Sequence, residues 1–156
     1  MKKLSSIVLC IILIAGFATL AHAGLDDFIR RVNEQAAHDI NRFASKVSSQ
    51  FGIPVPRVED VLRHVPTPAD AFMVFQLGQM SNKPPDMVLP VYQANRDRGW
   101  GAIAKELGIK PGSPEFHALK NGNLSFTGQP GGGGWDQQGG GGKKKGKGRG
   151  KGHNRD

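Results

Sequence analysis

The residues best suited to chemistry lie at the C-terminus, where basic side chains are interleaved with glycine. Residues 143–156 hold seven of them against one acid, Asp156: Lys143, Lys144, Lys145, Lys147, Arg149, Lys151 and Arg155. Closely spaced cations bind a polyanion by releasing its condensed counterions, and glycine offers no side chain that reads a sequence. The pattern predicts sequence-independent binding of an anionic polymer: nucleic acid such as extracellular DNA, acidic polysaccharide or lipopolysaccharide.

One aromatic residue lies in the glycine-rich stretch before these cations. Trp135 stands between two runs of glycine, residues 131–134 and 139–142. An indole ring can stack on a base or another π-face, a contact that contributes about 1–3 kcal/mol. Trp135 is therefore the expected aromatic partner of the seven cations. The alternative is that the whole segment is a spacer that binds nothing.

The rest of the chain offers little for catalysis or metal binding. Beyond the first 23 residues there are four histidines: His38, His64, His117 and His153. None forms an H-x-x-x-H or H-E-x-x-H pair that would hold zinc, and His117 beside Phe116 is the one to mutate first. Ser113 lacks the G-x-S-x-G context of a nucleophile and suits a helix N-cap. We expect no enzymatic activity, no metal and no cofactor.

The first 23 residues have the three parts of an export signal. Lys2 and Lys3 are followed by an apolar run over residues 7–20 and by Ala21-His22-Ala23, the small-x-small pattern that a signal peptidase cleaves. We expect a mature chain that begins at Gly24 and is periplasmic or extracellular. The alternative is a retained N-terminal anchor. Against it, the apolar run is about 14 residues long, shorter than the ~20 that cross a bilayer.

The single cysteine falls inside this leader. Cys10 is the only cysteine of the chain, so the mature protein has none. That excludes a disulfide framework, a thiol nucleophile, cysteine-ligated zinc and covalently attached c-type haem. No later segment is long and apolar enough to span a membrane, and we expect no stable transmembrane segment after cleavage.

Charge and glycine divide the remaining chain into two parts. Residues 24–142 carry 12 Lys or Arg and 12 Asp or Glu, so the net positive charge of the mature protein lies in the last fourteen residues. Thirteen of the 22 glycines fall between Gly128 and Gly152. A segment with few apolar side chains and high backbone entropy does not fold by itself. The expected organisation is a cleaved signal (1–23), a helical domain (24–127) and a disordered basic tail (128–156).

A long helix is predicted at the start of the body. Apolar residues recur there at three- and four-residue steps: Leu25, Phe28, Ile29, Val32, Ala36, Ile40, Phe43 and Val47. This spacing places them on one face. It predicts a single amphipathic helix over residues 25–50, ended by Gly52.

Proline and hydroxyl residues mark the shorter helices that follow. Thr67 and Pro68 form a start signal for a helix that is apolar on nearly all sides, which is typical of a buried central element. Pro85 opens another helix, and Ser113 caps the last. No segment alternates apolar and polar residues for long enough to predict a strand. The sequence therefore predicts an all-α fold, a small irregular bundle of about five to six helices.

A segment near the end of the body is dense in glycine, proline and aromatic residues. We expect Trp100, which stands between two glycines, to pack together with the apolar residues Ile103, Leu107 and Phe116. The segment resembles small, uncharacterised exported bacterial proteins with a W-G-x-I-A-x-x-L-G-x-x-P-G-S-x-x-F-H pattern. The matching residues are Trp100, Gly101, Ile103, Ala104, Leu107, Gly108, Pro111, Gly112, Ser113, Phe116 and His117. The resemblance implies a secreted helical domain of undefined activity and no catalytic residues.

Two interpretations of the function stay open. In the first, this is a secreted or periplasmic binding or structural protein: the tail holds an anionic polymer, and the helical body docks on itself or on an envelope protein. In the second, the body is an accessory or protein-interaction module of an envelope machine, and the tail is only a tether. Deletion of residues 128–156 separates them, because retention on heparin or DNA disappears only in the first case.

Overall fold

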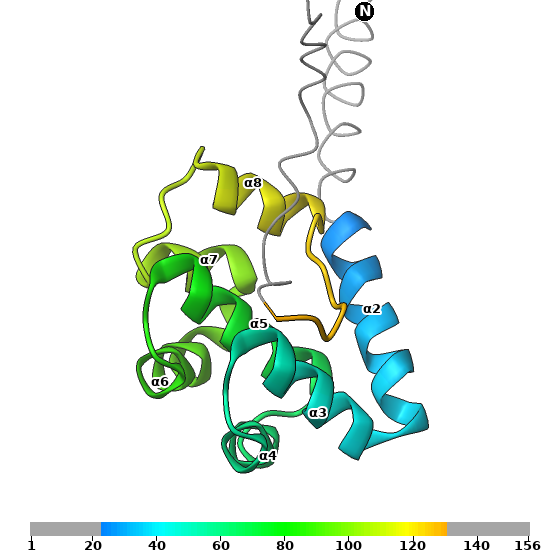
Figure 1. The fold of residues 1–156 in the computed structure, drawn as a ribbon. Coiled ribbons are helices and arrows are strands. Elements are labelled where there is room, and N and C mark those ends of the chain that lie inside the picture. Colours follow the sequence, from blue (N-terminus) through cyan, green and yellow to red (C-terminus); the bar gives the residue numbers. More distant parts are fainter. Residues whose placement is uncertain (1–22, 131–156) are drawn as a thin grey trace, which may run out of the picture.

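The computed structural model describes residues 23–130, and this part of the chain is helical, with no strand (Figure 1). Its helices are α2 (Ala23–His38), α3 (Ile40–Phe51), α4 (Val55–Arg63), α5 (Pro68–Ser81), α6 (Pro85–Asn95), α7 (Trp100–Glu106) and α8 (Pro114–Asn121). A 3-10 turn, η1 (Arg96–Arg98), joins α6 to α7. The predicted all-α class is confirmed.

Two predicted segments fall almost wholly outside the described residues. Of the predicted signal only Ala23 is described, as the first residue of α2. Of the predicted basic tail only residues 128–130 are described. Among the helices from α2 to α8, none combines the length and the apolar character needed to cross a bilayer.

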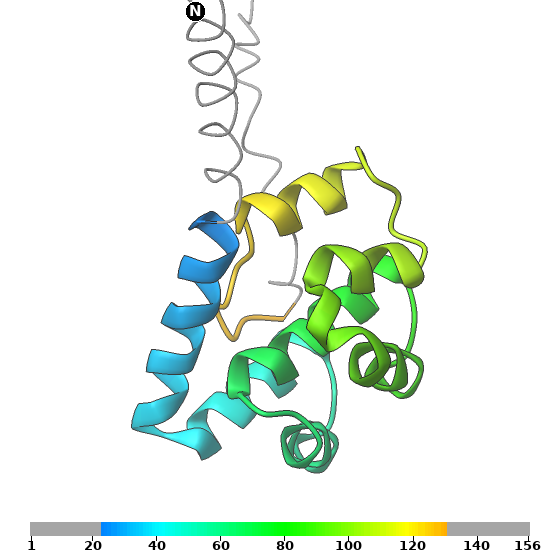
Figure 2. The ribbon, with the colours of Figure 1, turned by 180° about the vertical axis from the view of Figure 1, so that it is seen from behind.

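Helix α5 forms the centre of the bundle, as its composition predicts. Residues 71–78 are all buried, and α2, α3, α4 and α6 pack against this helix (Figures 1 and 2). The helix begins at the predicted start signal: the Thr67 hydroxyl accepts from the Asp70 amide at 3.2 Å, and the Asp70 carboxylate accepts from the Thr67 amide at 3.1 Å. This capping box satisfies two backbone donors of the first turn, and Pro68 pre-sets its geometry.

The single helix predicted over residues 25–50 is wrong, because the chain turns at Asp39. Helix α2 ends at His38 and α3 begins at Ile40, with Asp39 in an extended conformation (φ −164°, ψ 101°). The Asp39 carboxylate accepts from the Arg42 amide at 2.9 Å and so caps α3. Ile40 continues the apolar spacing but is 45% exposed, since the turn carries it away from the core. The break raises the number of described α-helices to seven, against the five to six predicted, and forms an elbow between α2 and α3.

The end of α8 meets the start of α2 in a close backbone approach. Gly122 ends α8 with a left-handed conformation (φ 67°) and lies directly against Gly24 at the start of α2. A Cβ atom on Gly122 would overlap the Gly24 carbonyl, so only glycine fits this position. The contact joins α8 to α2 and directs the following segment back into the bundle.

The segment after α8 returns along α2 and closes the inner side of the elbow (orange in Figures 1 and 2). Gln50 of α3, only 2% exposed, holds it in place. The Gln50 amide nitrogen donates to the Ser125 carbonyl at 2.7 Å. Its amide oxygen accepts from the backbone amides of Thr127 and Gly128 at 3.0 and 3.1 Å. A buried side chain thus replaces the backbone partners that an irregular segment lacks.

Candidate functional site

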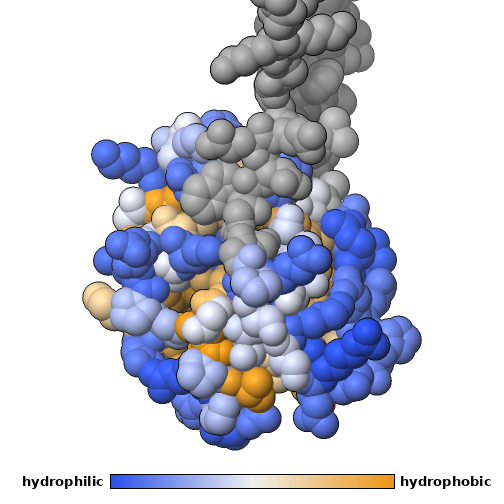
Figure 3. Space-filling model, in the orientation of Figure 1, coloured by the Kyte–Doolittle hydropathy of each residue, from blue (hydrophilic) through white to orange (hydrophobic). Residues whose placement is uncertain are grey.

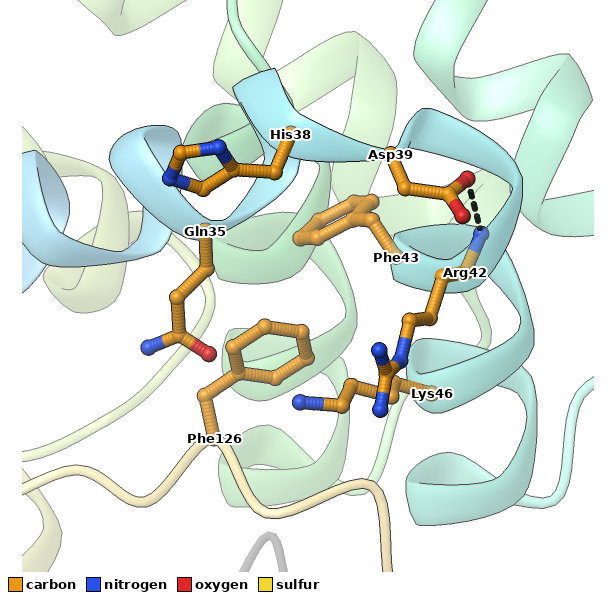
Figure 4. A pocket seen from close by; sticks show the side chains of 7 residues that line it. All are labelled: Gln35, His38, Asp39, Arg42, Phe43, Lys46 and Phe126. Atoms are coloured by element: carbon orange, nitrogen blue, oxygen red, sulfur yellow. Dashed lines mark hydrogen bonds between the residues drawn. The ribbon is translucent and has the colours of Figure 1, made fainter.

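A pocket of about 410 Å³ opens at the elbow between α2 and α3. We call it the elbow pocket, and its lining residues are Gln35, His38, Asp39, Arg42, Phe43, Lys46 and Phe126 (Figure 4). They come from the last turn of α2, the first two turns of α3 and the segment that follows α8. The break at Asp39 therefore creates the pocket, because a continuous helix would not bend around it.

The inner surface of the elbow pocket is aromatic. The Phe43 and Phe126 rings lie 5.2 Å apart between centroids, at an interplanar angle of 55°. The Phe126 ring also contacts Phe72 of the central helix α5 in an edge-on arrangement, with ring centroids 5.4 Å apart. Phe43 is 2% exposed, whereas Phe126 is half-buried and presents part of its ring to the opening. The pocket thus offers an apolar surface, supplied mainly by Phe126 and backed by the core.

The rim of the elbow pocket is basic. Arg42 and Lys46 lie one turn apart on α3, opposite Gln35 and His38 of α2 (Figure 4). The Lys46 ammonium lies 5.4 Å from the centroid of the Phe126 ring, a cation–π contact. Neither Arg42 nor Lys46 forms an ion pair with the residues from 23 to 130. Two cations without ion-pair partners, beside apolar rings, favour an anion that carries a flat apolar group.

The acid at the rim forms no ion pair with these cations. Asp39 is the one carboxylate among the described lining residues. Its oxygen is engaged by the Arg42 backbone amide, 2.9 Å away, and it lies at the positive end of α3. The Asp39 carboxylate caps the helix and keeps its charge, so the rim carries two cations against one carboxylate, and neither cation is held in an ion pair.

The predicted packing residues of the glycine-rich segment lie in one corner of the body, at α7 and α8. Ile103, Leu107 and Phe116 are 1%, 3% and 8% exposed, and Trp100 is half-buried. The Trp100 ring stacks on Tyr92 of α6, with centroids 5.2 Å apart and planes at 21°. Sequence reasoning did not pair these two rings, because they belong to separate helices.

Tyr92 has the most strongly shifted ionisation among the residues from 23 to 130. It is 4% exposed. Burial raises the pKa of its phenol to about 12, and the negative charge of Asp70 together with a hydrogen bond to it adds to the effect. The folded state therefore favours the neutral phenol. The hydrogen bond between Tyr92 and Asp70 is a structural contact between α6 and the start of α5.

This shift predicts a loss of stability at high pH. The folded pKa of about 12 lies above the ordinary value of 10.0, so the contribution of Tyr92 is complete below pH 10 and is lost as pH rises towards 12. The two-unit difference corresponds to about 3 kcal/mol. Tyr92 is the only tyrosine, so the ultraviolet absorbance of tyrosinate follows it directly. In urea unfolding at several pH values, Tyr92→Phe should lack this component of the alkaline decline. If the absorbance titration of the folded protein gave a pKa near 10 for Tyr92, burial would not be raising it.

The other polar candidates lie on the surface or in helix caps. His117 is exposed on α8, and His64 Nδ1 lies 2.7 Å from the Asp60 carbonyl at the end of α4. The Ser113 hydroxyl accepts from the Phe116 amide at 3.2 Å, which confirms the predicted N-cap. Within residues 23–130 no three His, Cys, Asp or Glu side chains gather as a metal site would require. The seven basic residues of the predicted anion-binding segment and Trp135 lie outside the described residues.

Sequence reasoning missed the elbow pocket. The spacing of Arg42 and Lys46, two like charges at i and i+4, was a local signal that they share a helix face. For Phe126 the sequence carried no such signal, since it reaches Phe43 and Lys46 from some 80 positions further along the chain. Only the folding of the last segment against α3 brings the aromatic and basic parts together.

Comparisons with known proteins add no further assignment. Protein-family models, curated proteins and solved structures were all compared with this chain, and none matched. The resemblance carried by the Trp100 segment stays a prediction. Function is therefore inferred from the residues of this chain and from their arrangement.

Proposed function

We propose that this protein is an exported, non-enzymatic binding protein that holds anionic polymers through its basic C-terminal residues without reading their sequence. Extracellular DNA, acidic polysaccharide and lipopolysaccharide are the candidate polymers. In this proposal residues 1–23 are a cleaved export signal. Gln50 of the helical body holds residues 125–128, and the chain continues from there to the basic residues.

The separation of charge along the chain is the observation that supports this proposal. Residues 143–156 carry seven Lys or Arg and one acid, whereas the body is balanced. Cations of the body already engage many of its acids; the ion pairs include Arg30–Asp27, Arg30–Glu34, Arg57–Asp86 and Arg63–Asp60. Two of these pairs lie on α2, whose outer side is the hydrophilic surface on the right of Figure 3. Because residues 24–142 carry as many Lys or Arg as Asp or Glu, they offer no excess of negative charge to the basic segment, and this favours an external polyanion.

Salt dependence tests the proposal. We expect the affinity of the mature chain for duplex DNA and for heparin to fall with salt on a log–log slope of about 5–6, because seven cations each contribute ~0.7–0.9. Two unrelated DNA sequences should bind equally. The triple variant Lys143→Gln, Lys144→Gln, Lys145→Gln should lower the slope by about 2–3.

A matched triple variant in the body controls for total charge. Arg31→Gln, Lys105→Gln, Lys110→Gln removes the same three charges from exposed positions of the helical body. Its slope should equal that of the unchanged chain. A wild-type slope below about one, or equal effects of the two triple variants, would show that the basic segment does not hold the polymer.

A further inference from the structure

We propose that the elbow pocket binds one base of a single-stranded nucleic acid, with the flanking phosphates on Arg42 and Lys46, and that it gives the protein a preference for single strands among polyanions. This inference rests on the proposed function, because the basic C-terminal residues supply most of the electrostatic attraction. The pocket then adds affinity for single-stranded nucleic acid over other polyanions.

The aromatic surface favours a base over a sugar. Phe126 supplies the accessible part of the aromatic surface, since Phe43 behind it is 2% exposed. Neither ring offers a hydrogen-bond donor or acceptor, and the Phe126 ring contacts Phe43 and Phe72. Sugar hydroxyl groups buried there would lose hydrogen bonds to water without replacement. A base presents a flat π-face, and stacking on an aromatic side chain accommodates every base. A volume of about 410 Å³ lies within the usual range of small-ligand pockets.

The basic rim is placed to hold phosphates beside such a base. Side chains at i and i+4 have Cβ atoms about 5–6 Å apart on one helix face, so Arg42 and Lys46 reach adjacent points of a strand. The Arg42 guanidinium can donate two parallel hydrogen bonds to one phosphate, and Lys46 acts as a point charge. Gln35 and His38 on the opposite wall add polar groups within reach of the edge of a base.

The pocket lies where the chain leaves the helical body toward its basic residues. Gly128 packs directly on the Lys46 side chain, and its amide is bound to Gln50. Lys143 is 13 residues beyond Pro130, a covalent span of at most about 45 Å. The same strand can therefore contact both the pocket and the basic residues, and each contact raises the effective concentration of the strand at the other.

A closed duplex cannot use the pocket. Its bases are stacked and paired, and flipping one out costs a few kcal/mol. A duplex and a sulfated polysaccharide should therefore bind through the basic residues alone. Comparing a single strand with these two ligands therefore distinguishes binding in the pocket from binding to the basic residues.

The test compares ligands and variants in the mature full chain. The probes are a fluorescent 12-nucleotide oligothymidylate, an abasic oligonucleotide of equal length, a 12-base-pair duplex and a size-matched heparin fragment. We expect Phe126→Leu to weaken oligothymidylate binding about 5- to 100-fold, the loss of one stacked base, and to change heparin and duplex binding less than about twofold. The abasic strand should bind the unchanged protein about 5- to 100-fold more weakly than oligothymidylate.

The abasic strand keeps the test valid if Phe126→Leu disturbs the fold, because it alters the ligand only. Arg42→Gln, Lys46→Gln should lower the salt slope for oligothymidylate by about 1.4, whereas Lys110→Gln, an exposed charge away from the pocket, should leave the affinity within twofold. Equal binding of abasic and thymidylate strands, or a larger loss for heparin than for DNA in Phe126→Leu, would overturn the inference. If the unchanged protein binds none of the four probes, the proposed function itself fails.

Discussion

Ending the chain at Pro130 should leave its stability unchanged and weaken its binding to DNA and heparin at least about a thousandfold in 50 mM salt. The deleted residues contain all seven cations of the basic segment. A protein with six to ten phosphate contacts changes its affinity about 10³- to 10⁵-fold between 50 and 200 mM salt, so the loss of seven such contacts removes most of the attraction. Fluorescence anisotropy with labelled DNA measures the affinity, and thermal unfolding measures the stability.

The structure decides where this truncation must be made. A cut before residue 128, the predicted start of the tail, would remove the Gly128 amide that Gln50 binds at 3.1 Å. A cut after Pro130 keeps every described contact of Gln50. The matched control retains the full length and replaces the seven basic residues by glutamine, and it should lose affinity to the same extent. If the truncated chain binds DNA as tightly as the full chain, the helical body carries the binding site and the proposed function is wrong.

Replacing Gln50 by leucine should lower the free energy of unfolding by about 2–4 kcal/mol. Leucine fills the buried position with an apolar side chain of similar size but leaves the Ser125 carbonyl and the Thr127 and Gly128 amides without their partner. Each polar group left unsatisfied on burial costs about 1–3 kcal/mol, and partial exposure of the segment to water moderates the sum. Urea unfolding of Gln50→Leu measures the change.

The same substitution should release the last segment from the elbow. Phe126 lies between the residues that Gln50 holds, and proteolysis near Phe126 should become faster in Gln50→Leu than in the unchanged protein. Gln93→Leu, the same chemical change at an exposed position of α6, should alter the unfolding free energy by less than about 0.5 kcal/mol. A change of similar size in both variants would mean that the three hydrogen bonds do not hold the segment.

Local signals predicted the central part of the fold well. Thr67, Pro68 and Asp70 lie within four residues, and together they mark the start of α5 without help from the rest of the chain. Ser113 does the same for α8. These predictions succeeded because a cap satisfies backbone donors of its own first turn, so that its effect is complete within one short stretch of sequence.

The break between α2 and α3 shows where local signals compete. The apolar spacing continues through Ile40, so periodicity alone predicts one helix. Asp39 is nevertheless a good N-cap, and the structure uses it in that way. Ile40 is exposed, whereas Phe43 and Val47 beyond the turn are buried. The free energy gained by burying these two side chains therefore outweighs the cost of exposing Ile40 and breaking the helix. Periodicity reports which face is apolar, but not whether the core requires the helix to bend.

By itself, the sequence determined the all-α class, the central position of α5 and the concentration of positive charge in the last fourteen residues, because each follows from composition or from neighbours within one or two turns. The tertiary structure alone decided that α2 and α3 form an elbow and that Phe126 completes a pocket there. The hydrogen bonds of Gln50 join residues 75 to 78 positions apart. Contacts of that range depend on how all the helices pack, and no short stretch of the chain encodes them.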